Sequence, residues 1–477
     1  MGPAVLRNAL FSMVGQLSAR LLALVFYALL ARMLGPERYG DQGFGAAVGT
    51  LFVVLLEPGL IPMFIRDAAR DRSVLERRLA ALLGYKLMML TLVWPASVLA
   101  AWAAGYHGDP LWAVVWAGGT ILVASVEDAC AGALTAVERL DLESSLRVVS
   151  KVVTVTLGGA ALLTHQPFAV VVACVCAGAA TAAATGVWFL GRAGIRLRVA
   201  WEPGPMFARV REAWPLAVHN VMWLLTLRLD QVMASAMGVP HDALGGYNGA
   251  VKVVEALILF PNAVALAFQP RLARAWAGGR EACAAELRPA LAASLGLTLA
   301  VAVGGALLAD GLAVLVYGER FRDAGPLLAI QLACLPLVGV QFLGACAMVA
   351  AGRIRLQAVT VAANFGVNVA LNLLLVPRFG VAGASWAAVG GGAAGAVVYA
   401  WGIRAVGLRA GWAAALLPAG AACAAMAAVV GLVVPEDWPV LTRVAAGAVV
   451  YAPVYWAAGG GRAIRALWTA RHTPGNG

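Results

Sequence analysis

Long runs of apolar residues, separated by short polar segments, make up most of this 477-residue chain. Many runs extend over about 20 residues, which is enough for a helix to cross a bilayer, and the short alternating runs of a membrane barrel are not seen. The pattern predicts an all-α polytopic membrane protein with about 14 transmembrane helices. The predicted helices cover residues 8–31, 43–65, 80–103, 110–137, 146–164, 167–190, 212–236, 244–269, 290–317, 324–350, 354–376, 381–403, 411–434 and 439–458.

Composition supports this class. Of all residues 62% are apolar and 12% are charged, whereas soluble domains carry about 25% charged residues. The 54 glycines are typical of helices that pack closely within a membrane. The seven cysteines lie mostly in apolar segments and form no C-x-x-C pair. We therefore expect them to pack as small apolar residues, without disulfides and without a metal site.

The basic residues follow the predicted loops. With the N-terminus inside, twenty-five of the 35 Lys and Arg residues lie in cytoplasmic segments and six lie in the outer loops. Cytoplasmic loops of membrane proteins carry such an excess, so the pattern predicts that both termini are cytoplasmic. The net charge of +11 is then a consequence of topology, and we predict no nucleic-acid partner.

Two pairs of segments about 200 residues apart resemble each other. Residues 34–48 read LGPERYGDQGFGAAV and residues 237–251 read MGVPHDALGGYNGAV; residues 138–144 and 352–358 form the second pair. The repeat relates the first six helices to the next six, and because six is even the two halves share one orientation. Parallel halves with a site between them are typical of transporters. The predicted domains are a six-helix bundle over residues 1–200, a second over 201–406, and two extra helices with a tail over 407–477.

Arg20 lies deep within the first predicted helix, and Gln16 precedes it by one turn on the same face. A charge at a helix centre in a membrane costs about 2.5–3.5 kcal/mol, so it usually faces a polar cavity or a partner. One interpretation is a cationic, hydrogen-bonding patch that lines a central cavity. In the alternative, Arg20 is structural, paired with Glu57 or Asp230, or extended to the membrane interface.

The two helices predicted over 212–236 and 244–269 contain further polar side chains. They include one amide, two cations and two carboxylates: Asn220, Arg228, Lys252, Asp230 and Glu255. Their clustering suggests that they form one charged side of a central cavity, opposite a side formed by Arg20 and Glu57 of the first half. Ion pairing, Lys252 with Glu255 and Arg228 with Asp230, is the alternative.

Asn364, Asn368 and Asn372 recur every four residues and form a polar stripe on one helix. Amides within a membrane must find partners, which can be neighbouring helices or a hydroxyl-rich substrate. Glu127 and Asp128 are adjacent on another helix and are expected to point to different faces. One of them is a candidate proton-linked carboxylate or a partner for a neighbouring helix.

Four segments together are similar to bacterial polysaccharide flippases of the multidrug/oligosaccharidyl-lipid/polysaccharide exporter superfamily. They are residues 31–44 (ARMLGPERYGDQGF), 229–255 (LDQVMASAMGVPHDALGGYNGAVKVVE), 269–271 (QPR) and 371–387 (LNLLLVPRFGVAGASWA). The resemblance covers nearly the whole chain. It implies two six-helix bundles arranged in a V and alternating access, which moves an undecaprenyl-pyrophosphate-linked oligosaccharide to the outer leaflet of the bacterial inner membrane.

The resemblance also implies a cationic central cavity. By position, Arg20, Arg228 and Lys252 are its candidate cations, and Gln16 and the asparagines complete the substrate set. Glu57, Asp230 and Glu255 offset these cations and are candidates for ion coupling. The implied partners are the lipid-linked oligosaccharide, membrane lipids and a polysaccharide polymerase or export machinery, with the protein itself a monomer.

Three alternatives stay open. A lipid II flippase and a cation-coupled drug exporter belong to the same superfamily, although a drug exporter favours an acidic, aromatic cavity. A membrane glycosyltransferase or polymerase would need carboxylates or histidine in large outer loops, and the predicted outer loops are short. We therefore expect no enzyme, no catalytic residues and no cofactor.

Overall fold

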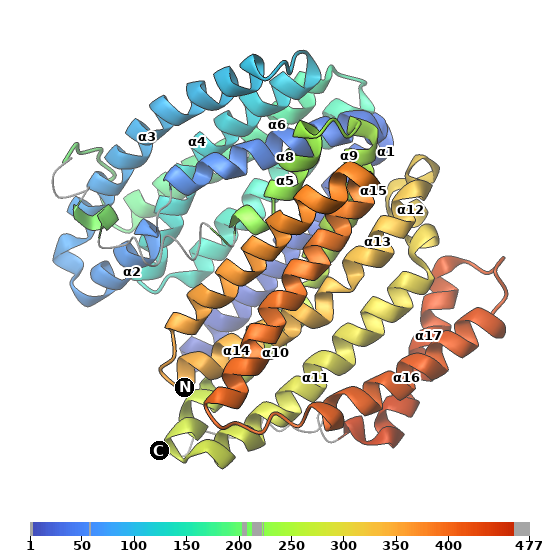
Figure 1. Cartoon of the computed structure of the whole chain (residues 1–477). Helices are drawn as coiled ribbons and strands as arrows, with labels where there is room; N and C mark the ends of the chain where they lie inside the picture. Colours follow the sequence, from blue (N-terminus) through green and yellow to red (C-terminus); the bar gives the residue numbers. More distant parts are fainter. Residues whose placement is uncertain (1–2, 57–58, 203–207, 212–221, 223, 462–477) are drawn as a thin grey trace. The chain divides into compact units, whose positions relative to one another are not determined.

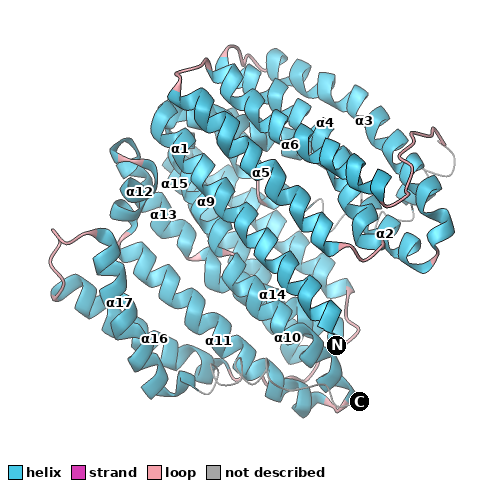
Figure 2. Cartoon of the chain, turned by 180° about the vertical axis from the view of Figure 1, so that it is seen from behind, coloured by secondary structure: helices cyan, strands magenta, loops and turns pink. Residues whose placement is uncertain are grey.

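The structure is a computed structural model that describes residues 3–56, 59–202, 208–211, 222 and 224–461; for residues 3–14, 16–17 and 53–56 it describes the backbone only. Within this part of the chain, every regular element is helical (Figure 2). The first half contains α1 (Pro3–Leu56), α2 (Leu60–Arg70), α3 (Leu75–Ala103), α4 (Asp109–Ala136), α5 (Leu140–Leu163) and α6 (Phe168–Arg192). The second contains α8 (Leu229–Ala236), α9 (His241–Leu257), α10 (Leu259–Ala277), α11 (Arg280–Leu307), α12 (Ala309–Tyr317), α13 (Gly325–Leu332), α14 (Cys334–Ala350), α15 (Arg355–Ala405), α16 (Trp412–Leu432) and α17 (Val440–Tyr455) (Figure 1).

The described helices confirm an all-α polytopic membrane protein. They include 11 continuous helical runs that are long and apolar enough to cross a membrane. Two of these runs, Ser18–Phe52 and Arg355–Ala405, each contain two predicted spans joined at a glycine with non-helical angles. Residues 212–221 and 223 of the span predicted over 212–236 fall outside the described residues, and α8 lies at the end of this span. The helices therefore agree with the prediction of about 14 spans.

By their contacts, the residues form two compact units. The first contains Met1–Ser235 and Pro240–Gly245, and the second contains Ala236–Val239 and Gly246–Gly477. The first unit packs around fully buried leucines such as Leu79, Leu134 and Leu190. The second packs around Phe268 and Leu287. The three-part division at residues 200 and 406 stays a prediction.

The repeat noticed in the sequence is built around matching glycines. Gly35 and Gly238 both have a φ of 81°, a left-handed conformation that a residue with a Cβ atom adopts only with strain. Each glycine turns the chain into the next helical segment, which is the second part of α1 in one copy and α9 in the other. The sequence similarity therefore reflects a shared turn that only glycine allows without cost.

The last two helices, for which the sequence suggested no role, pack on α11. Figure 1 shows α11, α16 and α17, drawn yellow to red, side by side, and their contacts agree. The Tyr451 hydroxyl donates to the Gly296 carbonyl at 2.5 Å, and the Tyr455 hydroxyl donates to the Ala292 carbonyl at 2.7 Å. These bonds hold α17 against α11 and satisfy both buried phenols.

Candidate functional site

A polar cavity lies between α1, α4 and α5 within the first unit. Its volume is about 470 Å³. Six of its lining side chains are ionisable, three cationic and three acidic: Arg20, Arg147, Lys151, Glu127, Asp128 and Glu143. Because charges are costly within an apolar helical bundle, six of them around one cavity mark the strongest candidate site in the described part of the chain.

One face of α5 supplies half of these charges. Glu143, Arg147 and Lys151 are spaced by four residues, so they lie above one another along the helix. Both cations lie within the helix predicted over residues 146–164, but they were counted with the cytoplasmic basic residues and not considered as site residues. In the structure α5 begins at Leu140, and both side chains line the cavity. The spacing of four was the signal that could have revealed them.

Close packing through glycine holds α5 in place. A Cβ atom at Gly158 would lie 2.4 Å from the Phe26 ring of α1, and one at Gly178 of α6 would lie 2.6 Å from the Ser150 carbonyl oxygen of α5. Such distances are far below van der Waals contact, so larger residues would push the helices apart. The small residues thus fix which face of α5 points toward the cavity.

Glu143 and Arg147 form the ion pair of the site. The Arg147 Nε atom lies 2.6 Å from Glu143 Oε1, and the Ser144 hydroxyl donates to Oε2 at 3.3 Å. The Glu143 side chain is 10% exposed and that of Arg147 is 45% exposed. A charge-assisted bond of this kind orients the guanidinium, which lines the cavity and has further N–H donors.

The other four charged side chains also line the cavity. Among the described residues, no opposite charge lies within 4.0 Å of Arg20, Lys151, Glu127 or Asp128. Adjacent residues of α4 were expected to face different ways, yet Glu127 and Asp128 both line the cavity. The site therefore offers donors and acceptors together, in a space that can hold a polar group.

The charges predicted in the next two helices lie at and before α8 and on α9. Arg228 precedes α8, and Asp230 is buried in α8 with its Oδ1 accepting from the Gln231 amide at 2.9 Å. Lys252 of α9 donates to Glu255 Oε2 at 2.9 Å, which is the ion pair considered in the sequence analysis. Their role in a central cavity stays a prediction.

The asparagine stripe of α15 is buried inside the second unit. Asn364, Asn368 and Asn372 are at most 6% exposed, and a Cβ atom at Gly391 would lie 2.8 Å from Asn364. The Asn372 amide donates to the Asn368 carbonyl at 2.9 Å, and the Asn364 amide lies 3.5 Å from Gln341 Oε1. The first bond lies within α15 and the second joins α15 to α14, so the described contacts leave both alternatives open, and substrate contact by these residues stays a prediction.

Three predicted site residues cannot be placed. Glu57 and Asn220 lie outside the described residues, and for Gln16 the structure describes the helical backbone of α1 only. In the described part, no group of three His, Cys, Asp or Glu residues has the geometry of a metal site.

A second cavity, in the other unit, is almost entirely apolar. It has a volume of about 640 Å³ and is lined by residues of α9 to α13, α16 and α17, including Leu257, Leu297, Val301, Met426 and Ala448. Arg443 and the two anchoring tyrosines are its only charged or phenolic members in the described part. Such a cavity suits a flexible hydrocarbon and excludes ions.

Two family models match the sequence. The model of the polysaccharide biosynthesis protein family matches residues 5–276, more than half of the chain, and the MatE model matches residues 215–374. Among curated proteins, none shows significant sequence similarity to the chain.

Solved structures share the fold. The lipid II flippase MurJ, in an inward closed conformation, superimposes with a TM-score of 0.77 at 14% identity over 94% of this chain and 98% of that one. A multidrug resistance MATE family transporter of the MOP superfamily, inward-facing, gives 0.61 at 14% identity, covering 85% and 98%. A MOP superfamily transporter from Pyrococcus furiosus gives 0.55 at 15% identity, covering 84% and 95%.

The superfamily resemblance read from the sequence motifs is thus confirmed by two independent comparisons, one of sequence and one of fold. The protein is a polytopic membrane protein with the fold of the MOP superfamily transporters, and it belongs to the polysaccharide biosynthesis protein family.

Proposed function

We propose that the protein is a flippase that moves undecaprenyl-pyrophosphate-linked oligosaccharide units from the cytoplasmic to the outer leaflet by alternating access. The observation that carries this proposal is the cavity between α1, α4 and α5, where three cations and three carboxylates surround about 470 Å³ within an apolar bundle. Membership of the polysaccharide biosynthesis protein family supports the glycan part of the substrate.

The chemistry of the cavity suits such a head group. A pyrophosphate leaves water only if strong donors replace its hydration, and Arg20, Arg147 and Lys151 supply guanidinium and ammonium donors. Sugar hydroxyls donate hydrogen bonds, which Glu127 and Asp128 can accept. A mixed-charge cavity therefore matches a phosphorylated glycan better than it matches a cationic drug, which would need mainly acidic and aromatic walls.

The apolar cavity of the second unit suits a lipid chain. Its lining of aliphatic side chains can hold several isoprene units without leaving a buried polar group unpaired. The proposal thus gives α16 and α17 a role in contacting a lipid chain.

The proposed function also implies a membrane, a topology and partners. It places the protein in the bacterial inner membrane with both termini cytoplasmic, as the distribution of basic residues predicts, acting as a monomer beside a polysaccharide polymerase or export machinery. No covalent step is needed, so no catalytic residue is proposed. Glu57, Asp230 and Glu255 remain candidates for ion coupling, and the exposure of Glu127 and Asp128 to the cavity adds these two.

The test is transport in proteoliposomes with a fluorescent undecaprenyl-pyrophosphate oligosaccharide and a membrane-impermeant quencher. Wild type should expose the outer-leaflet label far faster than empty vesicles. Arg20→Gln should slow the transport rate by at least about tenfold, because it removes one charge-assisted hydrogen bond to the substrate. Arg353→Gln, which removes an exposed arginine between α14 and α15, is the matched control and should keep the wild-type rate.

Two outcomes would count against the proposal. If wild type fails to move any lipid-linked sugar, the function is wrong. If it moves the substrate and both variants behave alike, the function stands but the cavity is not the site.

A second candidate, lipid II transport, is favoured by the fold similarity to MurJ over 94% of this chain. The two candidates share a lipid carrier and differ in the head group. Adding unlabelled lipid II to the same assay separates them: strong competition identifies lipid II as a substrate, and no competition at a large excess leaves the oligosaccharide.

A further inference from the structure

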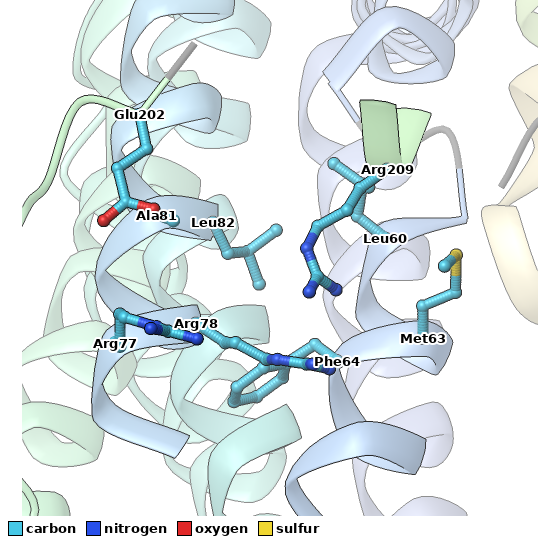
Figure 3. A pocket seen from close by; sticks show the side chains of 9 residues that line it. All are labelled: Leu60, Met63, Phe64, Arg77, Arg78, Ala81, Leu82, Glu202 and Arg209. Carbon is cyan, nitrogen blue, oxygen red and sulfur yellow. The ribbon is translucent and has the colours of Figure 1, made fainter. Parts of the chain in front are cut away.

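A second charged pocket lies between α2, α3 and the segment that follows α6, all within the first unit (Figure 3). Its volume is about 210 Å³. Leu60, Met63 and Phe64 of α2 and Leu82 of α3 form its apolar side. Drug-sized ligands usually occupy about 300–1,000 Å³, so this pocket suits a small polar group attached to the beginning of an apolar chain.

Arginines form the polar side of the pocket. Figure 3 shows Arg209 entering the space between α2 and α3 from above, and Arg78 extending from α3 toward Phe64. Arg77 lies beside Arg78 at the exposed edge, and Glu202 stands at the other end of the pocket.

Asp67 of α2 binds three arginines, two of which line the pocket. Arg66 lies 3.0 Å from its Oδ1 atom, Arg209 donates to Oδ2 at 3.2 Å, and Arg78 forms an ion pair with the same Oδ2 atom. Even with Glu202 included, the four guanidinium groups outnumber the carboxylates by two. Arg209 uses one of its five N–H donors in this way, so the others can reach a ligand.

The position of the pocket indicates a lipid rather than a soluble anion. The candidate membrane span that contains α3 begins at Arg72, so Arg77 and Arg78 lie within its first two turns. Phosphate head groups lie at the ends of membrane spans, and an acyl or isoprenoid chain next to them would meet the apolar side chains of α2. A free anion would gain nothing from Met63 and Phe64.

We propose that this pocket binds the phosphate group of a membrane lipid, with Arg77 and Arg209 as its donors. Guanidinium groups match phosphate oxygens through paired N–H bonds, and the apolar floor holds the first methylene groups of the chain. The site is separate from the cavity around Arg20, and it goes beyond the transport activity proposed above. Two lipids share the required chemistry: anionic phospholipid and the lipid pyrophosphate carrier.

The test is binding to the purified full-length protein, measured by native mass spectrometry in a detergent that releases loosely held lipid. The probe is phosphatidylglycerol, with phosphatidylcholine and inorganic phosphate as comparisons. Combining Arg77→Gln with Arg209→Gln should weaken phosphatidylglycerol binding by about tenfold or more. Arg70→Gln combined with Arg72→Gln is the matched control, because it removes two exposed charges nearby but outside the pocket, and should change binding less than about twofold.

Glu202→Gln gives a test that misfolding cannot imitate. It removes the acidic group from the pocket edge, so phosphatidylglycerol should bind several-fold more tightly. Two results would overturn the proposal. One is an equal loss of phosphatidylglycerol binding in the pocket double variant and in the control double variant. The other is unchanged binding both in Glu202→Gln and in the pocket double variant. Inorganic phosphate competing as well as the lipid would overturn the lipid assignment.

The same experiment distinguishes the two lipids. Displacement of phosphatidylglycerol by undecaprenyl pyrophosphate at low molar ratio would identify the carrier as the occupant, and resistance to displacement would identify the phospholipid. Because the experiment measures lipid binding and not transport, its result can be interpreted even if the flippase proposal fails.

Discussion

Replacing Gly40 with alanine should destabilise the first unit strongly for so small a change. A Cβ atom at this position would lie 1.9 Å from the carbonyl oxygen of His241 and 2.9 Å from its carbonyl carbon. Ordinary contact needs about 3.5 Å, so the second part of α1 and the first turn of α9 would have to separate by roughly 1.5 Å. Backbone cannot rotate away as a side chain can, so the cost lies toward the upper end of the usual 1–3 kcal/mol for overpacking. Alanine favours the helix by up to about 1 kcal/mol, which leaves a net loss of about 2 kcal/mol.

The close contact between α1 and α9 involves a glycine from each helix. A Cβ atom at Gly245 would lie 1.9 Å from the carbonyl oxygen of Pro36. Gly245→Ala should therefore cost about as much as Gly40→Ala. Since one separation of the helices relieves both clashes, the double variant should lose clearly less than the sum of the two losses.

The measurement is the apparent melting temperature of the purified protein in detergent. For a unit of this size, about 2 kcal/mol corresponds to a decrease of roughly 4–8 °C. Gly366→Ala is the matched control, because no atom lies within 4 Å of its added Cβ, and it should melt at or slightly above the wild-type temperature. If Gly40→Ala melts like Gly366→Ala, the close crossing does not exist in the protein; strictly additive losses would refute the shared-contact reasoning.

Three further predictions concern the two cavities. Arg147→Gln leaves the nearly buried Glu143 carboxylate without its partner and should lower the unfolding free energy by about 1–3 kcal/mol. Adding Glu143→Gln should restore most of this loss, which a double-mutant cycle of melting temperatures would measure. Tyr451→Phe removes the hydrogen bond to the Gly296 carbonyl and should cost about 1 kcal/mol, seen as a lower melting temperature. Ala448→Trp should fill part of the apolar cavity and slow flipping in proteoliposomes without lowering the melting temperature; an unchanged rate would argue that the lipid chain lies elsewhere.

The membrane class and the approximate spans could be predicted from the sequence because they depend on local properties. In a bilayer every backbone amide must bond within its own helix, so a long apolar run has only one stable structure available. The boundaries could not be predicted as closely, as α5 shows: its first turn contains Asp141 and Glu143, which lie before the helix predicted over residues 146–164 although they are helical. Charge density alone could not show that the Glu143 side chain lines a cavity.

The candidate site was predicted only in part, for a related reason. Arg20 could be singled out from the sequence, since an arginine deep in an apolar run needs a polar surrounding, and in the structure it lines the cavity. Its neighbours in the cavity, Arg147 and Lys151 of α5, come from a helix about 130 residues away, and nothing in the local pattern links the two. The asparagine stripe could also be recognised in the sequence. Its close contact with Gly391, which lies on the other part of α15, could not, because it is a tertiary contact.

The sequence by itself determined that this chain is a bundle of membrane helices with a repeated glycine turn, and its motifs placed it in the correct superfamily. These features follow from hydropathy, helix length and the conformational freedom of Gly35 and Gly238, which each segment expresses alone. The tertiary structure decided which charges share a cavity, which pair with one another, and where an arginine pocket forms beside Asp67. These depend on how each helix is rotated about its axis, and that rotation is set by close contacts such as Gly158 with Phe26, between residues far apart in the chain.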